Sequence, residues 1–332
     1  MAIVGLRYDL RSPGWAATKH PELYAACLEQ SAWADDHGVD IVTLSEHHGV
    51  DDGFLPAPLT MAAAIAARTT RVPITIAAAL LPLHDPIRLA EQIAVVDLVS
   101  RGRVSIVAGA GYAVQEFAMA GVDRKQRGKL LEESIEVMRQ AWTGEPFEYR
   151  GRTVRVTPTP FSKPHPMILI GGSSEAAARR AARLRLPFFP AIDDPHLVEV
   201  YREECDAGGF TGGFSMLPHG PGFVHIAEDP DKAWAEIAPY AWYDAETYRS
   251  WQTPGTRSAV TSHAADVDEL RREGVYRVVT PDQCVELAEE LGPAGALVLH
   301  PLLCGMPVEL GWESLELFAS KVLPRIKPSA GA

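Results

Sequence analysis

Cysteine is scarce in this chain, and the four cysteines that it has lie far apart. Cys27, Cys205, Cys284 and Cys304 form no C-x-x-C pair, so we predict neither a disulfide framework nor a zinc knuckle but four small buried hydrophobes. Long apolar runs are also missing, which argues against a membrane-spanning helix. The first twenty residues lack the basic start and apolar core of a secretory signal. These absences predict a cytoplasmic protein that does not contact a membrane.

Basic residues are outnumbered by acidic ones, 31 against 43, which leaves a formal net charge of −12. Nucleic acid is therefore not expected as a partner, because its binding needs clustered Lys and Arg. A phosphorylated ligand would have to be bound by local backbone donors instead of a broad positive field. The 47% of apolar and 22% of charged residues are ordinary for a folded globular protein and exclude a disordered chain.

Short β-branched runs alternate with longer amphipathic stretches along nearly the whole chain. Parallel neighbours need a crossover helix between them, and strands that are apolar throughout, such as 74–80, are typical of sheets covered on both faces. Asp85-Pro86 supplies an N-cap and a first-turn proline for one helix. Eight strand–helix units predict an α/β protein with a (β/α)8 TIM barrel, and a doubly wound open sheet is the alternative. Strands are predicted at 3–8, 40–45, 74–80, 103–108, 167–170, 187–192, 223–226 and 296–300, and helices at 22–37, 58–68, 86–100, 127–142, 174–185, 195–207, 230–240 and 312–323.

A barrel of this kind needs about 250 residues, so we predict one domain over 1–332 with about 80 residues in insertions. The insertions are expected near 146–166, where a β-hairpin is predicted, near the glycine-rich 207–222, and near the polar 251–276. We expect them at the C-terminal face of the barrel. The last two are predicted to close over the active site and exclude water.

Active sites of such barrels lie at the carboxyl ends of the strands, and Glu46-His47-His48-Gly49 follows the second strand. Adjacent residues of a strand point to opposite faces, so one histidine of the pair faces the barrel mouth. This disfavours a dinuclear metal site, which usually needs H-x-H. We predict catalytic roles for His47 and Glu46, with proton transfer by the imidazole. The alternative is a histidine that serves only as a satisfied polar group.

The exits of the third and fourth strands carry small residues. Ala77-Ala78-Ala79 would let a flat ring lie against the backbone, although tight packing explains the same residues equally well. Gly109-Ala110-Gly111-Tyr112 contains a G-x-G, but Val114 stands where the dinucleotide fingerprint needs a third small residue. We therefore predict a place where backbone meets ligand and not a Rossmann site.

The fifth strand runs through Gly171-Gly172-Ser173-Ser174 directly into a helix. Free N–H groups and the positive end of the helix dipole make a phosphate site there, and the two serines add hydroxyl donors. An ordinary serine cap on a glycine turn is the alternative. Glu175 in the first helical turn favours that alternative, because its carboxylate would compete with an anion.

Taken together, these segments resemble the bacterial luciferase family, or luciferase-like monooxygenases, over nearly the whole chain. The long segment after the third strand and the GGSS turn are the most specific. The resemblance is carried by SEHHG at 45–49, LPLHDPIRLAEQIAVVDLVSRGR at 81–103, the turn at 109–112, ILIGGSSEAAARRAAR at 168–183 and LHPLLCG at 299–305.

This resemblance implies a barrel that binds FMN, or in some branches a deazaflavin, without covalent attachment. A separate reductase would supply reduced FMN, which with O2 oxidises a small organic substrate, and the chain would form a homodimer. His47 matches the histidine near the flavin ring. Ala77-Ala78 matches the position where the family often has a non-proline cis peptide beneath the ring. Gly111-Tyr112 matches the turn beside the cofactor, and Gly172-Ser173-Ser174 the phosphate turn.

One departure concerns the fourth strand, where the luciferase α chain carries a cysteine and an arginine. This sequence has Ala108 and Gly109 there, which argues against light emission and removes one expected phosphate contact. Arg179 and Arg183 are candidates to replace that charge.

Three other functions stay open at this point. A deazaflavin enzyme would keep the fold and transfer hydride without using O2. A barrel metal hydrolase would use His47, Glu46 and His300, and a flavin-binding module would hold the cofactor without turnover. The aromatic stretch 240–243 and Trp251 either line an apolar substrate pocket or pack a helix.

Overall fold

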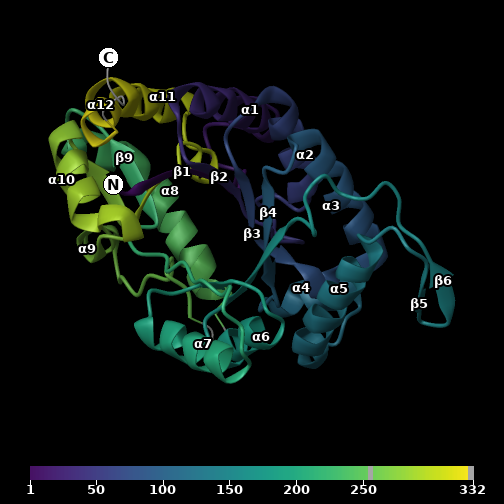
Figure 1. The fold of residues 1–332 in the computed structure, drawn as a ribbon. Helices are drawn as coiled ribbons and strands as arrows, with labels where there is room; N and C mark the ends of the chain where they lie inside the picture. Colours follow the sequence, from purple (N-terminus) through teal and green to yellow (C-terminus); the bar gives the residue numbers. More distant parts are fainter. Residues whose placement is uncertain (253–256, 328–332) are drawn as a thin grey trace, which may run out of the picture.

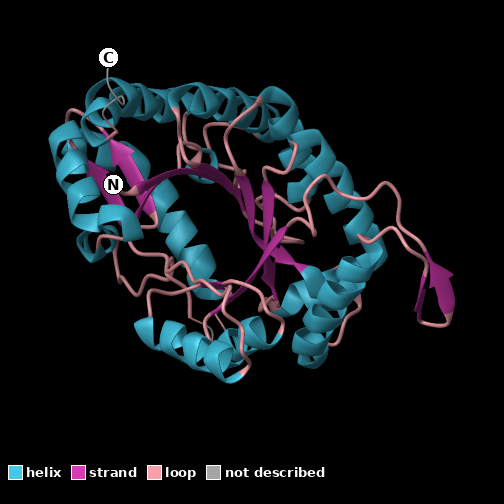
Figure 2. Cartoon of the chain, in the orientation of Figure 1, coloured by secondary structure: helices cyan, strands magenta, loops and turns pink. Residues whose placement is uncertain are grey.

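A nine-stranded parallel sheet forms the centre of the structure, a computed structural model that describes residues 1–252 and 257–327. Its strand order is β10-β9-β11-β1-β2-β3-β4-β7-β8, and the helices surround the curved sheet on its outside (Figure 1 and Figure 2). The strands are β1 (Ile3–Tyr8), β2 (Ile41–Leu44), β3 (Ile74–Leu80), β4 (Val104–Gly109), β7 (Met167–Gly172), β8 (Phe188–Pro190), β9 (Phe223–Ile226), β10 (Tyr276–Val279) and β11 (Ala296–Leu299).

Prolines, acidic caps and glycines fix the ends of the helices. The Asp85 carboxylate accepts hydrogen bonds from the backbone N–H groups of Ile87 and Arg88 at the start of α3, as the Asp-Pro pair predicts. α1 ends at Gly38, whose φ of 70° is the left-handed conformation that glycine adopts readily. The helices are α1 (His20–His37), α2 (Pro58–Arg68), α3 (Pro86–Ser100), α4 (Val114–Ala120), α5 (Arg127–Ala141), α6 (Glu175–Arg183), α7 (Pro195–Ala207), α8 (Pro230–Ser250), α9 (Val267–Glu273), α10 (Pro281–Leu291), α11 (Val308–Leu317) and α12 (Leu323–Ile326).

All eight predicted strand–helix units are present, which confirms the TIM-barrel class of the fold. The strand and helices that the prediction lacks are β10, α4, α9, α10 and the short α12. β10, α4 and α9 have four, seven and seven residues, too few for a clear period. α10 does carry a local signal, since Thr280 and Gln283 form a capping box at its start.

α8 extends ten residues beyond its predicted end. It contains Pro239, yet it continues to Ser250. The residues after the proline bury Ala241, Asp244 and Tyr248, a spacing that keeps one face of the helix packed. Tertiary packing therefore outweighs the backbone hydrogen bond that the proline removes.

The sheet curls toward a barrel but, within the described residues, its end strands β8 and β10 do not pair with each other. Other segments lie at this opening. Ser215 forms a short parallel bridge with Phe188, and the backbone N–H of Ala259 donates to the carbonyl of Ala191 at 2.8 Å. The predicted ring of eight strands is thus a nine-stranded sheet that stays open between β8 and β10, with loop segments beside β8.

Two of the three predicted insertions lie at the end of the barrel opposite to the predicted one. Segment 146–166 leads into the first residue of β7 and holds the hairpin of β5 (Phe147–Tyr149) and β6 (Arg152–Val154), which projects from the body (Figure 1). Segment 207–222 pairs with Phe188 and Ala296, the first residues of β8 and β11. The prediction that 207–222 covers the active site is therefore wrong, because these are amino ends of strands. The single-domain organisation stays a prediction.

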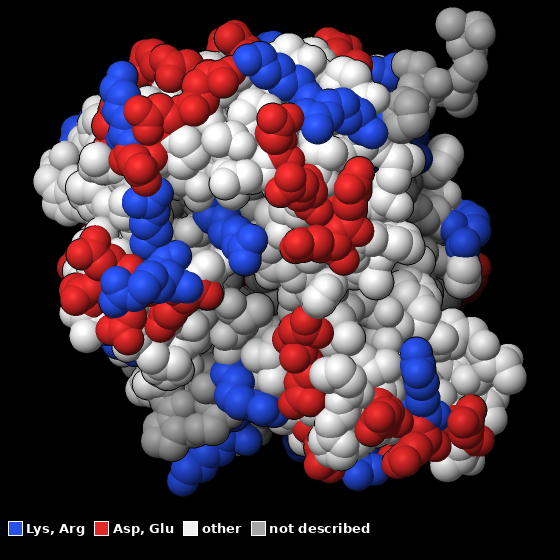
Figure 3. Space-filling view, turned by 90° about the vertical axis from the view of Figure 1, so that its left-hand side faces the viewer, with Lys and Arg blue, Asp and Glu red and all other residues white. Residues whose placement is uncertain are grey.

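The predicted burial of the cysteines is confirmed. All four cysteines are buried and free of disulfides. None of the described helices has the length and the apolar character that crossing a lipid bilayer requires. On the face shown in Figure 3, acidic and basic side chains are interspersed, and ion pairs such as Arg325–Asp282 and Arg271–Asp231 (both 2.6 Å) join α12 to α10 and α9 to α8.

Candidate active site

The carboxyl ends of β3 and β4 lie side by side, and no long side chain covers their backbone at Ala77, Ala78 and Gly109. The Ala77–Ala78 peptide bond is cis, as the resemblance implies, and the pairing of β3 with β4 shifts register there. A Cβ on Gly109 would lie 2.8 Å from the Cβ of Ala78, so this position has no room for a side chain. The arginine that the luciferase α chain carries after this strand could not be accommodated here.

The carboxyl end of β7 and the turn after β4 extend this surface of uncovered backbone. A Cβ on Gly171 would lie 2.9 Å from Cγ1 of Val107 on β4. Gly111 and Gly172 have φ of 74° and 150°, conformations that favour glycine. The predicted residues of three neighbouring strands are thus brought together in one half-buried strip.

His47 lies beside the Gly-Ala-Gly-Tyr turn and is held by a carboxylate that the sequence analysis does not identify. Its Nδ1 is 2.8 Å from Oε1 of Glu116, and the same oxygen accepts a hydrogen bond of 2.9 Å from the backbone N–H of His48. Glu116 is 1% exposed and lies in the first turn of α4. The only signal for it in the sequence is an acidic residue four positions after Tyr112.

This arrangement fixes which nitrogen of His47 faces the mouth. Because Nδ1 lies against the Glu116 carboxylate, it carries the proton, and Nε2 presents a lone pair. Nε2 is 3.5 Å from the hydroxyl of Tyr112. A histidine oriented by a buried carboxylate can accept a proton at Nε2 and return it.

Glu46 is buried after the carboxyl end of β2, and both of its carboxylate oxygens accept hydrogen bonds. Its Oε1 accepts hydrogen bonds from Nε2 of His48 (2.8 Å) and of His84 (2.6 Å), and its Oε2 accepts one from the backbone N–H of Leu80 (2.8 Å). These bonds tie the exit of β2 to that of β3. Glu46 therefore joins the two strand ends, and its catalytic role stays a prediction; His84 is a further residue of this cluster, which the sequence does not indicate.

Glu46 and His48 make stability depend on pH in opposite directions. Burial acts to raise the pKa of Glu46, but hydrogen bonds from His48, His84 and Leu80 outweigh it and lower the pKa from 4.5 to about 2. Its contribution to the free energy of unfolding is full above pH 4.5 and lost as the pH falls toward 2. The hydrogen bond to Glu46 raises the pKa of His48 above 6.5 against the effect of partial burial, so that contribution is lost as the pH rises through the raised pKa.

Glu46→Gln is therefore expected to destabilise the protein most between pH 4.5 and 6.5, with a smaller difference from wild type on either side. Urea unfolding at roughly pH 3 to 8 measures this difference. Glu148→Gln, at an exposed position of the hairpin, is the control and should show no such window. A difference that stays constant over the whole range would contradict the assignment of Glu46 and His48.

Aromatic rings surround the imidazole of His47. Their centroids lie 4.7 Å (Phe54), 4.6 Å (Trp251) and 6.3 Å (Tyr248) from that of the imidazole. Trp251, an alternative lining residue in the sequence analysis, is thus at the mouth. Tyr240 instead packs against Trp15, with centroids 5.1 Å apart.

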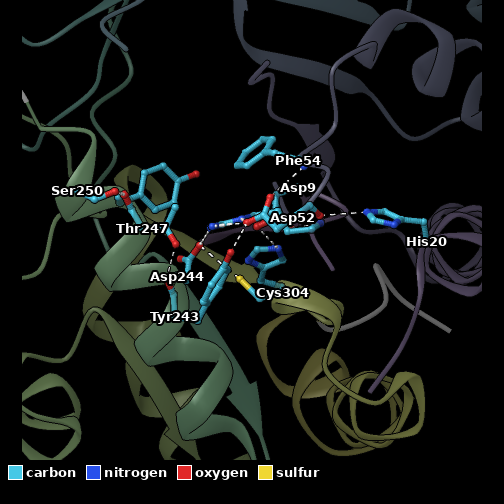
Figure 4. A network of polar contacts seen from close by, with 12 residues as sticks. Asp9, His20, Asp52, Phe54, Tyr243, Asp244, Thr247, Ser250 and Cys304 are labelled. Atoms are coloured by element: carbon cyan, nitrogen blue, oxygen red, sulfur yellow. Dashed lines mark hydrogen bonds and ion pairs between the residues drawn. The ribbon is translucent and has the colours of Figure 1, made fainter. Parts of the chain in front are cut away.

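A buried arginine links these aromatic rings to the barrel. The Arg11 guanidinium donates to Asp52 (2.8 Å) and to Asp244 of α8 (2.5 Å). Tyr243 donates to Asp52 at 3.0 Å, and Tyr276 of β10 donates to Asp244 at 2.7 Å. Figure 4 shows Asp52 facing the Tyr243 and Asp244 side chains of α8. This network, which joins three distant parts of the chain, is also absent from the sequence predictions.

At the Gly-Gly-Ser-Ser turn the structure shows the serine cap, and the phosphate site stays a prediction. The Ser174 hydroxyl caps α6 by accepting from the N–H of Ala177 at 3.3 Å. The backbone N–H groups of Ser173 and Ser174, by contrast, meet no acceptor among the described residues. Glu175 is paired with Arg179 (3.1 Å) and His196 (3.2 Å), which reduces its competition with an anion.

The arginine at this turn is not one of the two predicted. Arg179 pairs with carboxylates of α6 and α7, and Arg183 pairs with Glu132 at 3.2 Å. Arg257 reaches the turn instead, with its guanidinium 3.3 Å from the carbonyl of Ser173 and its backbone N–H 3.4 Å from the Ser173 hydroxyl. Residues 253–256 of the same predicted insertion lie outside the described residues.

The residues proposed for a metal hydrolase are not assembled. Within the described chain, the groups whose atoms could share one metal ion are Glu46-His48-His84 and Asp9-Asp244-Cys304. His47 belongs to neither, and Nε2 of His300 lies 3.5 Å from Asp9.

Fold and site together define an α/β-barrel enzyme with a backbone-lined mouth at the carboxyl ends of its strands. The chain belongs to the luciferase-like monooxygenase family, whose family model matches residues 10–297. It is 25% identical over 314 residues to limonene 1,2-monooxygenase of Rhodococcus erythropolis, covering 87% of this chain and 78% of that protein. An uncharacterized protein of Sinorhizobium fredii is 30% identical over 161 residues, but the chain spans only 46% of its length.

Solved structures share the whole fold. A monooxygenase from Streptomyces bottropensis superposes with a TM-score of 0.78 at 24% identity, covering 97% of this chain and 98% of that one. The oxygenating constituent of 3,6-diketocamphane monooxygenase of Pseudomonas putida, in complex with FMN, gives 0.75 at 23% identity over 98% and 99%. An F420-dependent secondary alcohol dehydrogenase gives 0.69 at 17% identity over 98% and 99%.

Proposed function

We propose that this protein is a flavin-dependent monooxygenase that uses reduced FMN and O2 on a small organic substrate. The observation that carries the proposal is the strip of bare backbone at the exits of β3, β4 and β7, which lies beside His47 and ends at the start of α6. Ala78 and Val107 pack against the Cβ positions of Gly109 and Gly171, so these two residues must be glycine and no side chain of theirs covers the backbone against which a planar ring would lie. Bound FMN would supply the electrons that activate O2.

The phosphate of FMN would be bound at the Gly-Gly-Ser-Ser turn. The N–H groups of Ser173 and Ser174 and the Ser173 hydroxyl are available donors, and the helix dipole of α6 favours an anion. Arg257 also lies at this turn, where it pairs with Asp194 at 3.3 Å, so the backbone N–H groups remain the main donors for an anion. Gly172 keeps this turn in a conformation with φ of 150°.

The protein itself would position the reactants, transfer a proton and exclude water. His47 accepts and returns a proton at Nε2, while Glu116 holds the imidazole and Glu46 holds the strand exits. The rings of Phe54 and Trp251 lie against the imidazole, which strengthens electrostatic interactions around it and keeps water from side reactions.

Similarity supports FMN and keeps a deazaflavin as the second candidate. One structural neighbour is a monooxygenase in complex with FMN. Another is a secondary alcohol dehydrogenase that depends on F420, a deazaflavin. From the family resemblance we also propose a separate flavin reductase as partner and a homodimer, and from the sequence a cytoplasmic location.

The experiment that tests the function supplies purified protein with reduced FMN, or with reduced deazaflavin, in the presence and absence of O2. We expect substrate oxidation that needs both FMN and O2, measured as oxygen consumption together with oxygenated product. Hydride transfer with deazaflavin that does not consume O2 would contradict the proposal and support the second candidate. Flavin binding without turnover of any substrate would leave only a binding module.

A further inference from the structure

One arginine of the first strand faces the interior of the barrel. Val4, Leu6 and Tyr8 of β1 are fully buried, and the Tyr8 hydroxyl contacts Gln30 of α1, so these residues point outward to the helices. Arg7 lies between them in sequence and therefore points to the opposite face of the sheet. The positions paired with it across β2, β3 and β4 are polar: Thr43, Thr75 and Ser105.

The guanidinium of Arg7 makes only one hydrogen bond within the described residues. Its Nη2 donates to the hydroxyl of Tyr248 at 2.8 Å, and no carboxylate of the described chain lies within ion-pair distance. Arg7 is only partly buried, and its other two nitrogens are not sealed from solvent. Barrel interiors are normally filled with branched apolar side chains, so a half-open arginine there has donors available for a ligand.

These donors lie at the proposed reaction site. The ring of Tyr248 is 6.3 Å from that of His47, and the Tyr112 hydroxyl is 3.5 Å from Nε2 of His47. Tyr248 accepts the hydrogen bond from Arg7, which leaves its own O–H free to donate. Arg7 and Tyr248 thus present hydrogen-bond donors beside the aromatic rings that surround His47.

The surrounding charges decide between a neutral and an anionic acceptor. The two arginines Arg7 and Arg11 face the three carboxylates of Asp9, Asp52 and Asp244, and His300 lies 3.5 Å from Asp9. Positive side chains thus do not outnumber the carboxylates, and the interior has no excess of positive charge for the carboxylate of a substrate. A carbonyl oxygen accepts the same hydrogen bonds without adding charge.

We propose that Arg7 and the Tyr248 hydroxyl bind the carbonyl oxygen of a neutral apolar ketone beside His47, which makes ketones the substrate class of this enzyme. The inference rests on the proposed function, and it names the substrate of the same site. Arg7 then determines specificity: it selects the oxygenated substrate over the hydrocarbon of the same skeleton.

The test is a titration of the FMN-loaded protein with a panel of cyclic and open-chain ketones, each paired with the hydrocarbon and the carboxylate of the same skeleton. A hydrogen bond from a charged donor is worth about ten- to hundredfold in affinity. We expect at least one ketone to bind tighter than its hydrocarbon by this factor and no weaker than its carboxylate. Arg7→Gln should remove the preference and raise KM for the ketone, with FMN affinity unchanged.

Two further variants keep the test decisive. Tyr248→Phe removes only the hydroxyl and should reduce the preference by about two- to tenfold, even if Arg7→Gln does not fold. Arg277→Gln, at an exposed position of β10, should retain it. Equal binding of every ketone and its hydrocarbon, or tighter binding of the carboxylates, by protein that binds FMN overturns this inference alone. Protein that does not bind FMN overturns the proposed function instead.

Discussion

His47→Gln is expected to lower the turnover of substrate by about 10²- to 10⁴-fold, the usual contribution of a general acid–base group. The glutamine keeps a polar side chain of similar reach but cannot take up a proton. FMN affinity should stay within about twofold of wild type, because the imidazole is held by Glu116 at one nitrogen and faces the mouth with the other. Turnover with saturating reduced FMN and a separate flavin titration measure the two effects.

The carboxylate that orients His47 provides an internal comparison. Glu116→Gln keeps an acceptor for Nδ1 but removes the negative charge, so we expect a smaller loss of turnover and a shifted pH profile. His263→Gln replaces an exposed histidine and should change neither quantity. Unchanged turnover in His47→Gln protein with bound flavin would remove this histidine from the mechanism.

Arg11→Met is expected to lower the free energy of unfolding by about 3–5 kcal/mol, because it leaves two carboxylates buried without their partner. The guanidinium is fully buried and contacts Asp52 and Asp244 at 2.8 and 2.5 Å. Its carbon lies 5.1 Å from the ring centre of Tyr243 and 5.6 Å from that of Trp251, so its loss also removes packing from the rings around His47. Equilibrium unfolding in urea measures the change.

The matched control for this prediction is Arg88→Met. Arg88 is exposed and pairs with Glu91 one turn along α3, and such surface pairs contribute about 0–1 kcal/mol. A loss of less than about 1 kcal/mol in Arg11→Met as well would mean that Asp52 and Asp244 are not charged and paired as the structure has them.

The architecture could be predicted from the sequence because its signals are local. Each strand such as β3 is an apolar run of its own, and each helix such as α3 carries its own cap at Asp85. β10 escaped prediction because four residues carry too little pattern. Whether segment 207–222 lies at the amino or the carboxyl end of the barrel depends on which strands it contacts. No local sequence pattern predicts those contacts.

The site was predictable where single turns define it. The residues at 77–78, 109–112 and 171–174 are small or polar for reasons of backbone shape, and these appear in the sequence. Pairings between distant residues do not: Arg11 and Asp244 are 233 positions apart, and His47 and Glu116 are 69 apart. Only the fold shows that such residues are neighbours, which is why the sequence does not predict the positions of Glu116 and Arg257.

The most direct test of the central claim is an equilibrium titration of the protein with FMN and with riboflavin, followed by flavin absorption and fluorescence. We predict saturable binding, with FMN bound at least about tenfold more tightly than riboflavin, a difference of about 1.4 kcal/mol for the phosphate. Gly109→Val should lose this binding, since its side chain would meet Ala78, whereas Gly14→Val, where a Cβ meets nothing within 4 Å, should retain it. Equal affinities for the two flavins, or a Gly109→Val protein that binds FMN like wild type, would contradict the claim that this mouth binds FMN.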